Sequence, residues 1–315
     1  MRSGRATCPH VDALAKIAQA SGSVTGIYVF SRGAKRALAI GLVLGMPVVA
    51  RAAVPLDEDG GPTLTAEAVL VLDTKTGKPL LARRATEVRS IASLTKLMAA
   101  LVFINRGLKL DEGTEINRDD WKVALDGCRT RLELKWTYSN RDLLHAALMS
   151  SDNRAVSALG RAVRLHANAL VQAMNEQARK MGLRKTQFRG PVGIEPENVS
   201  TAWEMSRIVR AASHIPALRE IMGKKEHRVV PMRGYLKRWY RNTNPLVGAT
   251  KDTTFLASKT GFNHKAGYCL ATVVELPRRG TVTIVLLGSK RKADRVRDLR
   301  RVLRWLRAGG LQKSS

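Results

Sequence analysis

The sequence predicts an α/β protein of the α+β type, in which one antiparallel sheet is formed by both chain ends and a helical region is inserted between its halves. Two observations lead to this prediction. Runs rich in apolar and β-branched residues, separated by turn residues, occur within 68–82 and again within 255–288. Between them, apolar residues recur with helical spacing. The 315 residues, of which 44% are hydrophobic, suffice to bury a full core.

The strands are expected at both ends of this region. A hairpin joins AVLVLD (68–73) to PLLA (79–82) through a turn that contains Gly77. The C-terminal part adds three strands: FLASKTG at 255–261, GYCLATVVEL at 267–276 and TVTIVLLG at 281–288.

Helices are expected where apolar residues recur three and four positions apart, at residues 94–105, 140–150, 154–165, 168–181 and 202–213. The first of them should present one apolar face. Ser139 with Asp142 has the spacing of a capping box. Thr201 with Glu204 repeats that spacing, and Gly182 stands where a left-handed C-cap ends a helix.

A final helix is expected at residues 293–307, with apolar residues on one side and arginines on the other. A basic amphipathic helix can lie on a membrane surface, but a helix with one apolar face beside a sheet more often packs into the core. We therefore favour packing against the sheet.

The N-terminal residues have the order of a secretory signal. Basic residues precede the apolar run ALAIGLVLGMPVVA (37–50), and the small-x-small triplet at 50–52 follows it. The run is too short for a comfortable membrane span. We expect removal of residues 1–52 as a signal peptide, no transmembrane anchor afterwards, and a single domain, residues 53–315, in the periplasm. Residues 1–30 form a long lead-in, for which a start codon assigned too far upstream is one hypothesis.

The chain is strongly basic, with 54 Lys+Arg against 26 Asp+Glu and a net charge of +28. Removal of the leader takes away seven basic residues and one acid, a loss of six, and leaves +22. Such a charge attracts nucleic acid, lipid head groups and anionic cell-wall polymers. An exported protein does not meet the chromosome, and aromatic residues make up only 5% of the chain. We expect a wall polymer as partner and no nucleic acid.

The cysteines leave one question open. Cys8 belongs to the leader, so Cys128 and Cys269 remain in the exported chain. In an oxidising compartment they can pair, but the sequence does not show whether their Cα atoms lie within bridging distance. We favour two buried thiols over a disulfide.

The first candidates for chemistry are Ser93 and Lys96, in SLTK at the start of the first long helix. A serine at a helix N-terminus lies near the positive end of the dipole, where an oxyanion is favoured. Lys96 falls one turn further on and can accept the serine proton if it is neutral, which burial and a nearby cation favour. A second Ser-x-x-Lys match runs from Ser289 to Lys292; it follows a strand and heads a run of charge, so we interpret it as a solvated loop.

The second candidate motif is Ser151-Asp152-Asn153, between two predicted helices. A hydroxyl there can pass a proton to a leaving group, and an asparagine amide can hold a substrate carbonyl or steady the lysine. Ser, Asp and Asn are also the preferred helix caps, so the triplet taken alone favours a cap.

The triplet Lys-Thr-Gly occurs twice, and context separates the copies. Residues 75–77 form the tip of the first hairpin, where Gly adopts a positive φ while Lys and Thr point to water. Lys259, Thr260 and Gly261 instead extend the strand FLASKTG. A glycine there lets a substrate backbone approach, and an edge strand can bind an extended peptide. Lys259 can hold a carboxylate and help to keep Lys96 neutral.

In this order the motifs SLTK, SDN and KTG resemble those of the active-site serine penicillin-recognising enzymes, with better specificity together than alone. Further stretches narrow the resemblance: IASLTKLMAA, RDLLHAALMSSDNRA, GIEPENVSTA, RNTNPLV and LASKTGF. They are similar to the low-molecular-mass D-alanyl-D-alanine peptidases of the S11 family, most closely the endopeptidase type known as penicillin-binding protein 7. The resemblance runs from about Leu64 to Leu306. It implies a β-lactamase/transpeptidase-like fold and cleavage of peptidoglycan crosslinks.

The resemblance also implies catalytic roles. Ser93 would be the acyl-ester nucleophile, Lys96 its proton acceptor and Ser151 a proton shuttle. It implies peptidoglycan as the substrate, β-lactam antibiotics as covalent inhibitors, and neither a metal nor a cofactor.

The same resemblance implies a set of substrate-binding residues. Asn153 would be a substrate ligand, and Lys259 would bind the substrate carboxylate together with Thr260 and Gly261. The backbone N–H of Phe262 would complete an oxyanion hole with that of the nucleophile.

Two departures from the family pattern concern the pocket rim. Cys128 stands where the family tends to have a small hydroxyl residue, and GPVGIEPEN (190–198) replaces a more usual Pro-Thr-Gly-Leu. A class A β-lactamase shares the motifs and needs a water-activating carboxylate, for which Glu195 and Glu197 are candidates at short spacing. The alternatives are therefore a carboxypeptidase, a class A β-lactamase and a non-catalytic wall-binding protein. The six histidines show no metal-ligand spacing, and we interpret His145 as structural.

Overall fold

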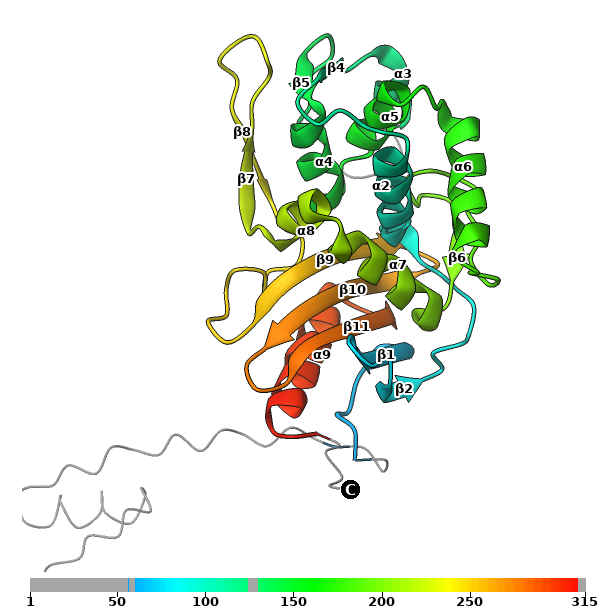
Figure 1. The fold of residues 1–315 in the computed structure, drawn as a ribbon, viewed down its shortest axis with the longest axis vertical. Coiled ribbons are helices and arrows are strands. Elements are labelled where there is room, and N and C mark those ends of the chain that lie inside the picture. The colour runs from blue at the N-terminus through cyan, green and yellow to red at the C-terminus, as the bar shows by residue number, and fades with distance from the viewer. Residues whose placement is uncertain (1–55, 57–59, 124–129, 311–315) are drawn as a thin grey trace, which may run out of the picture. The chain divides into compact units, whose positions relative to one another are not determined.

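A five-stranded antiparallel sheet forms the centre of the fold. The computed structural model describes residues 56, 60–123 and 130–310. The strands lie in the spatial order β2-β1-β11-β10-β9 (Figure 1). Their bounds are β1 Ala68–Asp73, β2 Pro79–Arg83, β9 Thr254–Asn263, β10 Gly267–Leu276 and β11 Gly280–Ser289. Strands from both ends of the described chain therefore build one sheet, as predicted, and β9 lies at its edge.

Alternation along the strands sends side chains to two separate cores. In β1, Leu70 and Leu72 face the large core shared with the helical region, whereas Val69 and Val71 face a smaller core. Helix α9 (Lys292–Arg307) covers the smaller core with its apolar residues. The preference for packing over a membrane-surface location is thus confirmed for this helix.

The remaining helices lie on the other side of the sheet, where α7 and α8 pack directly on its strands (Figure 1). They are η1 Ala92–Leu94, α2 Thr95–Asn105, α3 Arg118–Val123, α4 Asn140–Met149, α5 Asn153–Ala162, α6 Ala167–Lys180, α7 Ala202–His214 and α8 Pro216–Gly223. Each predicted helix is present, with ends that differ by at most three residues from the prediction.

Helix α2 is the central element of the helical region. Every residue from Thr95 to Phe103 is buried, because α4, α5, α6 and α7 all contact this helix. The predicted apolar face is buried as expected, and the other residues of this stretch are buried as well, so α2 has the all-round burial of a core helix. A helix enclosed in this way holds its N-terminal turn, which carries the SLTK motif, in a fixed position.

The predicted helix ends are confirmed by their hydrogen bonds. The Ser139 side chain accepts from Asp142 N at the start of α4, and the Thr201 side chain accepts from Glu204 N at the start of α7. Gly182, after α6, has a φ of +65°.

Several short elements were not predicted. Besides α3 and α8 they are three paired sets: β3 (Arg89–Ser90) with β6 (Val199–Ser200), β4 (Gly113–Glu115) with β5 (Thr137–Ser139), and β7 (Glu226–Val229) with β8 (Arg238–Arg241). Strands of two to four residues are too short to establish a period of two in the sequence.

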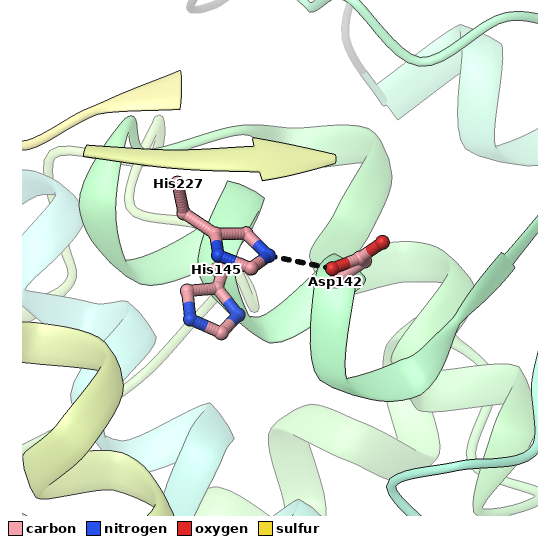
Figure 2. A group of neighbouring side chains, drawn as sticks. All are labelled: Asp142, His145 and His227. Atoms are coloured by element: carbon pink, nitrogen blue, oxygen red, sulfur yellow. Dashed lines mark hydrogen bonds and ion pairs between the residues drawn. The ribbon is translucent and has the colours of Figure 1, made fainter. Parts of the chain in front are cut away.

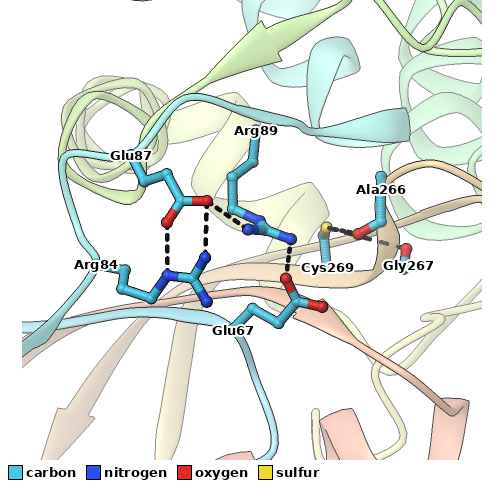
Figure 3. A network of polar contacts seen from close by, with 7 residues as sticks. All are labelled: Glu67, Arg84, Glu87, Arg89, Ala266, Gly267 and Cys269. Carbon is cyan, nitrogen blue, oxygen red and sulfur yellow. Dashed lines mark hydrogen bonds and ion pairs between the residues drawn. The ribbon is translucent and has the colours of Figure 1, made fainter.

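Charged residues fasten the segment that leads into SLTK to the sheet (Figure 3). Arg89, in β3, forms ion pairs with Glu67 and, at 2.7 Å, with Glu87. Arg84 holds the same Glu87 carboxylate at 2.6 Å. The network ties β3 to the residues that precede β1.

Cys269 is a buried free thiol in β10. Its sulfur lies 3.5 Å from the carbonyl oxygen of Ala266 (Figure 3), and burial raises the pKa of this thiol to about 11. Cys128 and the predicted leader, residues 1–52, lie outside the described residues. In the part of the chain that the structure describes, no helix combines the length and the apolar character needed to cross a membrane.

Candidate active site

Two glycines hold the turn that carries Ser93. Ala92, just before it, has a φ of +47°, which is rare for a residue other than glycine. A Cβ built on Gly193 would lie 2.1 Å from the Ala92 carbonyl oxygen, and one on Gly261 would lie 2.9 Å from the Ile91 carbonyl oxygen. The interpretation that Gly261 leaves room for a substrate backbone therefore needs correction, because the protein's own turn occupies that space.

Ser93 and Lys96 form a buried pair at the start of α2. Lys96 Nζ donates to Ser93 Oγ at 3.0 Å. Lys96 is 1% exposed and Ser93 is 9% exposed, so packing rather than solvent determines both side-chain positions. A serine hydroxyl within hydrogen-bond distance of an amine is the arrangement that activation of a nucleophile by a base requires.

A backbone carbonyl takes part in the same contact. Lys96 Nζ also donates to Val192 O at 2.6 Å, and Ser93 Oγ lies 3.4 Å from that oxygen. Val192 belongs to GPVGIEPEN, the stretch that departs from the family pattern. The sequence does not reveal this contact, because a main-chain carbonyl is present at every residue and leaves no signal in the sequence.

Asn198 fastens the loop that carries this carbonyl. Its Nδ2 donates to Thr95 Oγ1 at 3.0 Å and to Gly190 O at 2.8 Å, which ties the loop to the SLTK turn. The two carboxylates of the loop have different surroundings. The carboxyl group of Glu195 packs closely on Gly190, since a Cβ added to Gly190 would lie 1.9 Å from the Glu195 carboxyl carbon. Glu197 is exposed.

In the turn between α4 and α5, Asp152 caps a helix and the adjacent Ser151 contacts a lysine of the sheet. Asp152 is the N-cap of α5 and accepts from Arg154 N at 3.0 Å. Its other oxygen accepts from Tyr240 Oη at 3.2 Å, and desolvation by burial raises the pKa of Asp152. Ser151 precedes it with a φ of +65° and bonds to Lys259. The cap interpretation therefore holds for Asp152, while Ser151 has a different partner.

Lys259 connects the edge strand to this turn. It is fully buried, and its Nζ donates to Ser151 Oγ at 2.9 Å and to Thr260 O at 2.8 Å. Thr260 Oγ1 donates to Thr243 Oγ1 at 2.7 Å. Asn153 begins α5 and is 2% exposed. The fold thus brings the KTG and SDN residues into direct contact.

Phe262 differs from the other candidates because it is 45% exposed. Its ring stacks on Tyr268 with the centroids 4.2 Å apart and meets His264 edge-on at 5.7 Å. Phe262 follows Gly261 directly, so this aromatic group lies next to the strand residue that covers the Ser93 turn.

The second copies of the motifs lie elsewhere in the fold. Lys75 and Thr76 are exposed in the turn between β1 and β2, at the sheet edge opposite β9, which confirms their interpretation as turn residues. The interpretation of Ser289 as part of a solvated loop is wrong. Ser289 is fully buried as the last residue of β11, and Lys292 already belongs to α9.

The fold gathers three potential metal ligands that the sequence spacing did not suggest, Asp142, His145 and His227 (Figure 2). One ligand atom from each lies within 4.8 Å of the others, and His227 Nε2 bonds to Asp142 Oδ1 at 2.7 Å. The two imidazole rings stack with centroids 3.5 Å apart and an interplanar angle of 14°. A metal ion lies in the plane of each imidazole that binds it, and two nearly parallel rings do not share such a point. In these rotamers the group is a stacked, hydrogen-bonded cluster.

His145 is the buried member of this cluster. It is 1% exposed, and its Nδ1 lies 2.9 Å from the carbonyl oxygen of Arg141, one helical turn earlier. Desolvation, together with the nearby charges of His227 and Lys224, lowers the pKa of His145 to about 4. This environment agrees with the structural role predicted for it.

Comparison with known proteins extends these observations to most of the chain. A sequence model of the peptidase S11 family, described as D-alanyl-D-alanine carboxypeptidase, matches residues 56–290. A D-alanyl-D-alanine endopeptidase of Pseudomonas aeruginosa is 34% identical over 259 residues, which cover 82% of this chain and 81% of that protein. One from Escherichia coli is 29% identical over 248 residues, 79% of each protein.

The fold has its own match. The crystal structure of the Streptomyces K15 DD-transpeptidase superposes with a TM-score of 0.71 at 26% identity, covering 79% of this chain and 99% of that one. The sheet built from both chain ends with a helical insertion is therefore the DD-transpeptidase and β-lactamase-like fold. With a family match that includes all three motifs, the chain belongs to the S11 family of serine DD-peptidases, which are hydrolases.

Proposed function

We propose that this protein is a periplasmic serine D-alanyl-D-alanine endopeptidase that cleaves peptidoglycan crosslinks through an acyl-enzyme on Ser93. The observation that carries the proposal is a pair of buried amine–hydroxyl contacts. Lys96 Nζ lies 3.0 Å from Ser93 Oγ, and Lys259 Nζ lies 2.9 Å from Ser151 Oγ. The first contact places a base beside the proposed nucleophile, and the second holds the Ser151 hydroxyl in position for its proposed proton transfer.

In the proposed acylation, neutral Lys96 removes the hydroxyl proton of Ser93 while Oγ bonds to the D-alanyl carbonyl carbon. The backbone N–H groups of Ser93 and Phe262 stabilise the negative charge on the carbonyl oxygen. When the peptide C–N bond breaks, Ser151 donates its proton to the leaving nitrogen. Ser151 then receives the proton held by Lys96, so no net proton is gained or lost by the protein.

Deacylation reverses these roles with water as the nucleophile. A water molecule loses a proton to Lys96 as its oxygen bonds to the ester carbonyl carbon. The C–O bond to Ser93 then breaks, and the serine oxygen takes the proton back. The products are a free carboxylate and a free amine, and the sum is hydrolysis of one peptide bond.

Substrate binding follows from the position of β9 at the sheet edge. An edge strand can accept an extended peptide through main-chain hydrogen bonds. In this proposal Lys259 holds a substrate carboxylate, Thr260 and Gly261 continue the binding strand, and Asn153 holds a substrate amide. The charge of Lys259 also favours the neutral form of Lys96.

Two observations support the choice of substrate and compartment. Both relatives named above are endopeptidases, which favours crosslinks over terminal D-alanine. The family description is D-alanyl-D-alanine carboxypeptidase, and this keeps removal of a terminal D-alanine as the second candidate function. The predicted leader supports the periplasm as the location.

The test is to incubate the purified full chain and its Ser93→Ala variant with labelled penicillin and to follow the intact mass. We expect a long-lived adduct that is absent from the variant, and cleavage of crosslinked muropeptide dimers. Release of D-alanine from monomeric pentapeptides without dimer cleavage would favour the carboxypeptidase. Rapid turnover without an adduct would indicate a β-lactamase, and no reaction would indicate a wall-binding protein. Full dimer cleavage by Ser93→Ala would refute the acyl-enzyme.

A further inference from the structure

A hairpin outside the motif cluster carries an unusual surface. It consists of residues 226–241, with β7, β8 and the connecting residues 230–237, and is called the basic aromatic hairpin below. Figure 1 shows it projecting from the helical region beside α4. The residues at its tip, 232–235, are all exposed.

Large apolar side chains are exposed along this hairpin. Tyr235 is 95% exposed, Met232 is 55% exposed and Trp239 is 52% exposed. Among the large hydrophobic residues of the described chain, Tyr235 is the most exposed. Single exposed apolar residues are normal on protein surfaces, but three within one short hairpin indicate an interaction surface.

The same hairpin is strongly basic, with five Lys/Arg against one acid in residues 226–241. Two of the basic residues form ion pairs within the protein. Arg238 pairs with Glu133 at 3.2 Å, and Arg241 pairs with Glu226 at 3.5 Å. The other three basic residues are exposed and form no ion pair with the described residues: Arg228, Arg233 and Lys237. The surface therefore combines aromatic rings with cations that are available to a ligand.

The strand register places one cation beside one ring. Arg228 and Trp239 are directly paired across β7 and β8, so their side chains stand on the same face, about 5 Å apart at Cβ. On the opposite face Val229 and Tyr240 are buried. One face of the hairpin anchors it to the protein, and the other presents a ring next to a guanidinium.

The hairpin is attached directly to the candidate active site. Tyr240 Oη donates to Asp152 in the SDN turn at 3.2 Å. Four residues after Trp239, Thr243 accepts from Thr260 of the KTG motif at 2.7 Å. A chain of four residues spans at most about 14 Å. A polymer held on the exposed face can therefore also reach the candidate active site.

We propose that the basic aromatic hairpin binds the glycan strand of peptidoglycan next to the crosslink that is being cleaved. A sugar ring presents a flat C–H face that packs on an aromatic ring, and the carboxylates of the attached peptides fit Arg and Lys. This inference rests on the proposed function and deepens it, because it makes the preferred substrate a crosslink attached to polymeric glycan. An anionic membrane fits less well, because charged residues interrupt the apolar side chains of the hairpin and leave no continuous apolar face.

The experiment uses the double substitution Tyr235→Ala/Trp239→Ala in the full chain. The matched control is Trp203→Ala, which removes a tryptophan of similar exposure, 39%, on α7. Sedimentation with purified sacculi measures binding, and Ser93→Ala is added to every protein so that no substrate is consumed. We expect the dissociation constant to rise about tenfold for the double variant and to stay unchanged for the control. Loss of affinity with added salt should be shallower for Arg228→Gln/Arg233→Gln/Lys237→Gln.

A catalytic comparison separates this role from a structural one. With Ser93 restored, kcat/KM on sacculi relative to kcat/KM on soluble crosslinked dimers should fall about tenfold for the double variant. An equal loss on both substrates would overturn the proposal, since the hairpin would then act on the candidate active site itself. Unchanged binding of the double variant to sacculi would also overturn it. The same proteins are sedimented with vesicles of anionic phospholipid, and a loss of affinity confined to these vesicles would likewise overturn the proposal.

Misfolding and failure of the proposed function remain distinguishable from failure of this inference. Tyr235→Ala alone removes a side chain that is 95% exposed, so it leaves the core intact and must lower sacculus binding in the same direction. If the parent chain neither reacts with penicillin nor cleaves dimers, the proposed function fails. The binding comparison keeps its meaning in that case, because it is made with Ser93→Ala proteins.

Discussion

Lys259 Nζ lies 2.9 Å from Ser151 Oγ, although 108 positions separate these residues along the chain. Both side chains are buried, so the contact depends on how the sheet packs on the helical region rather than on local structure. A buried ammonium group is tolerated only when hydrogen bonds compensate its lost hydration. This contact and the one to the Thr260 carbonyl supply such bonds.

Ser151→Ala tests the proton shuttle. We expect acylation by penicillin to slow by a factor on the order of 10² to 10⁴, because the hydroxyl that would protonate the leaving nitrogen is absent. The control is Ser150→Ala, which removes the adjacent hydroxyl that bonds to Arg241 O at 2.9 Å. The acylation rate, followed by intact mass, should change only in Ser151→Ala. Equal rates for the two variants would remove Ser151 from the mechanism.

The two Lys-Thr-Gly copies make a matched pair. Lys259→Ala removes the proposed carboxylate ligand, so kcat/KM for a D-alanyl peptide should fall roughly 10- to 100-fold, the worth of one charged hydrogen bond. Lys75→Ala changes an exposed turn at the opposite sheet edge and should leave kcat/KM within about twofold. Steady-state kinetics give kcat/KM for both variants and show which Lys-Thr-Gly copy binds the substrate. A large loss in Lys75→Ala would reverse the assignment of the two copies.

Gly193→Ala tests the close approach above the Ser93 turn. Gly193 has a φ of +88°, and an added Cβ would meet the Ala92 carbonyl oxygen at 2.1 Å. We expect the free energy of unfolding to fall by about 3 kcal/mol, from backbone strain and displacement of the turn, together with slower acylation. Gly77 has a similar φ of +72°, but a Cβ added there would meet no atom within 4 Å. Gly77→Ala should therefore lower the free energy of unfolding by about 1 kcal/mol and leave the acylation rate unchanged. Urea titration and acylation rates of both variants provide the comparison.

The buried histidine predicts a loss of stability in acid. The pKa of His145 is lowered from 6.5 to about 4 in the folded protein, so the unfolded chain binds a proton first as the pH falls. The resulting destabilisation is absent above pH 6.5, grows below it and is complete near pH 4. At pH 5 it should amount to about 2 kcal/mol. His145→Asn keeps an N–H for the Arg141 carbonyl but does not titrate.

Urea denaturation of both proteins at pH 7.5 and pH 5 measures this difference. The unfolding free energy of the parent chain should fall by about 2 kcal/mol more than that of His145→Asn between the two pH values. Parallel losses would mean that His145 is not the group responsible. The charges that face it, Asp142, Lys224 and His227, are the same in both proteins.

Much of the fold was predictable because its long elements carry regular patterns. The sheet strands alternate between two cores, and the helices repeat their apolar residues every three to four positions. The β7–β8 hairpin was not predicted, because strands of four residues with mixed charge have no distinct period. The all-round burial of α2 was also missed, since a local pattern does not show how many neighbours a helix has.

In the candidate site, too, some residues were predictable from the sequence and others were not. SLTK, SDN and KTG were recognisable because the three motifs in this order are more specific together than any one of them alone. The Val192 carbonyl and the roles of Gly193 and Gly261 were not, because main-chain contacts between distant segments have no sequence signature. Thr243 and Tyr240 contact the motifs through their side chains, and they were missed because tertiary packing alone brings them to Thr260 and Asp152.

By itself, then, the sequence determined the order of the long strands and helices, the choice between the two Lys-Thr-Gly copies, and the side chains available for chemistry. These properties are encoded locally, in periodicity, caps and turns. Only the tertiary structure decided that Lys259 meets Ser151, which segments cover the Ser93 turn, and that a basic aromatic surface stands beside the candidate active site. Such contacts join residues about a hundred positions apart, and packing of the whole core sets their distances.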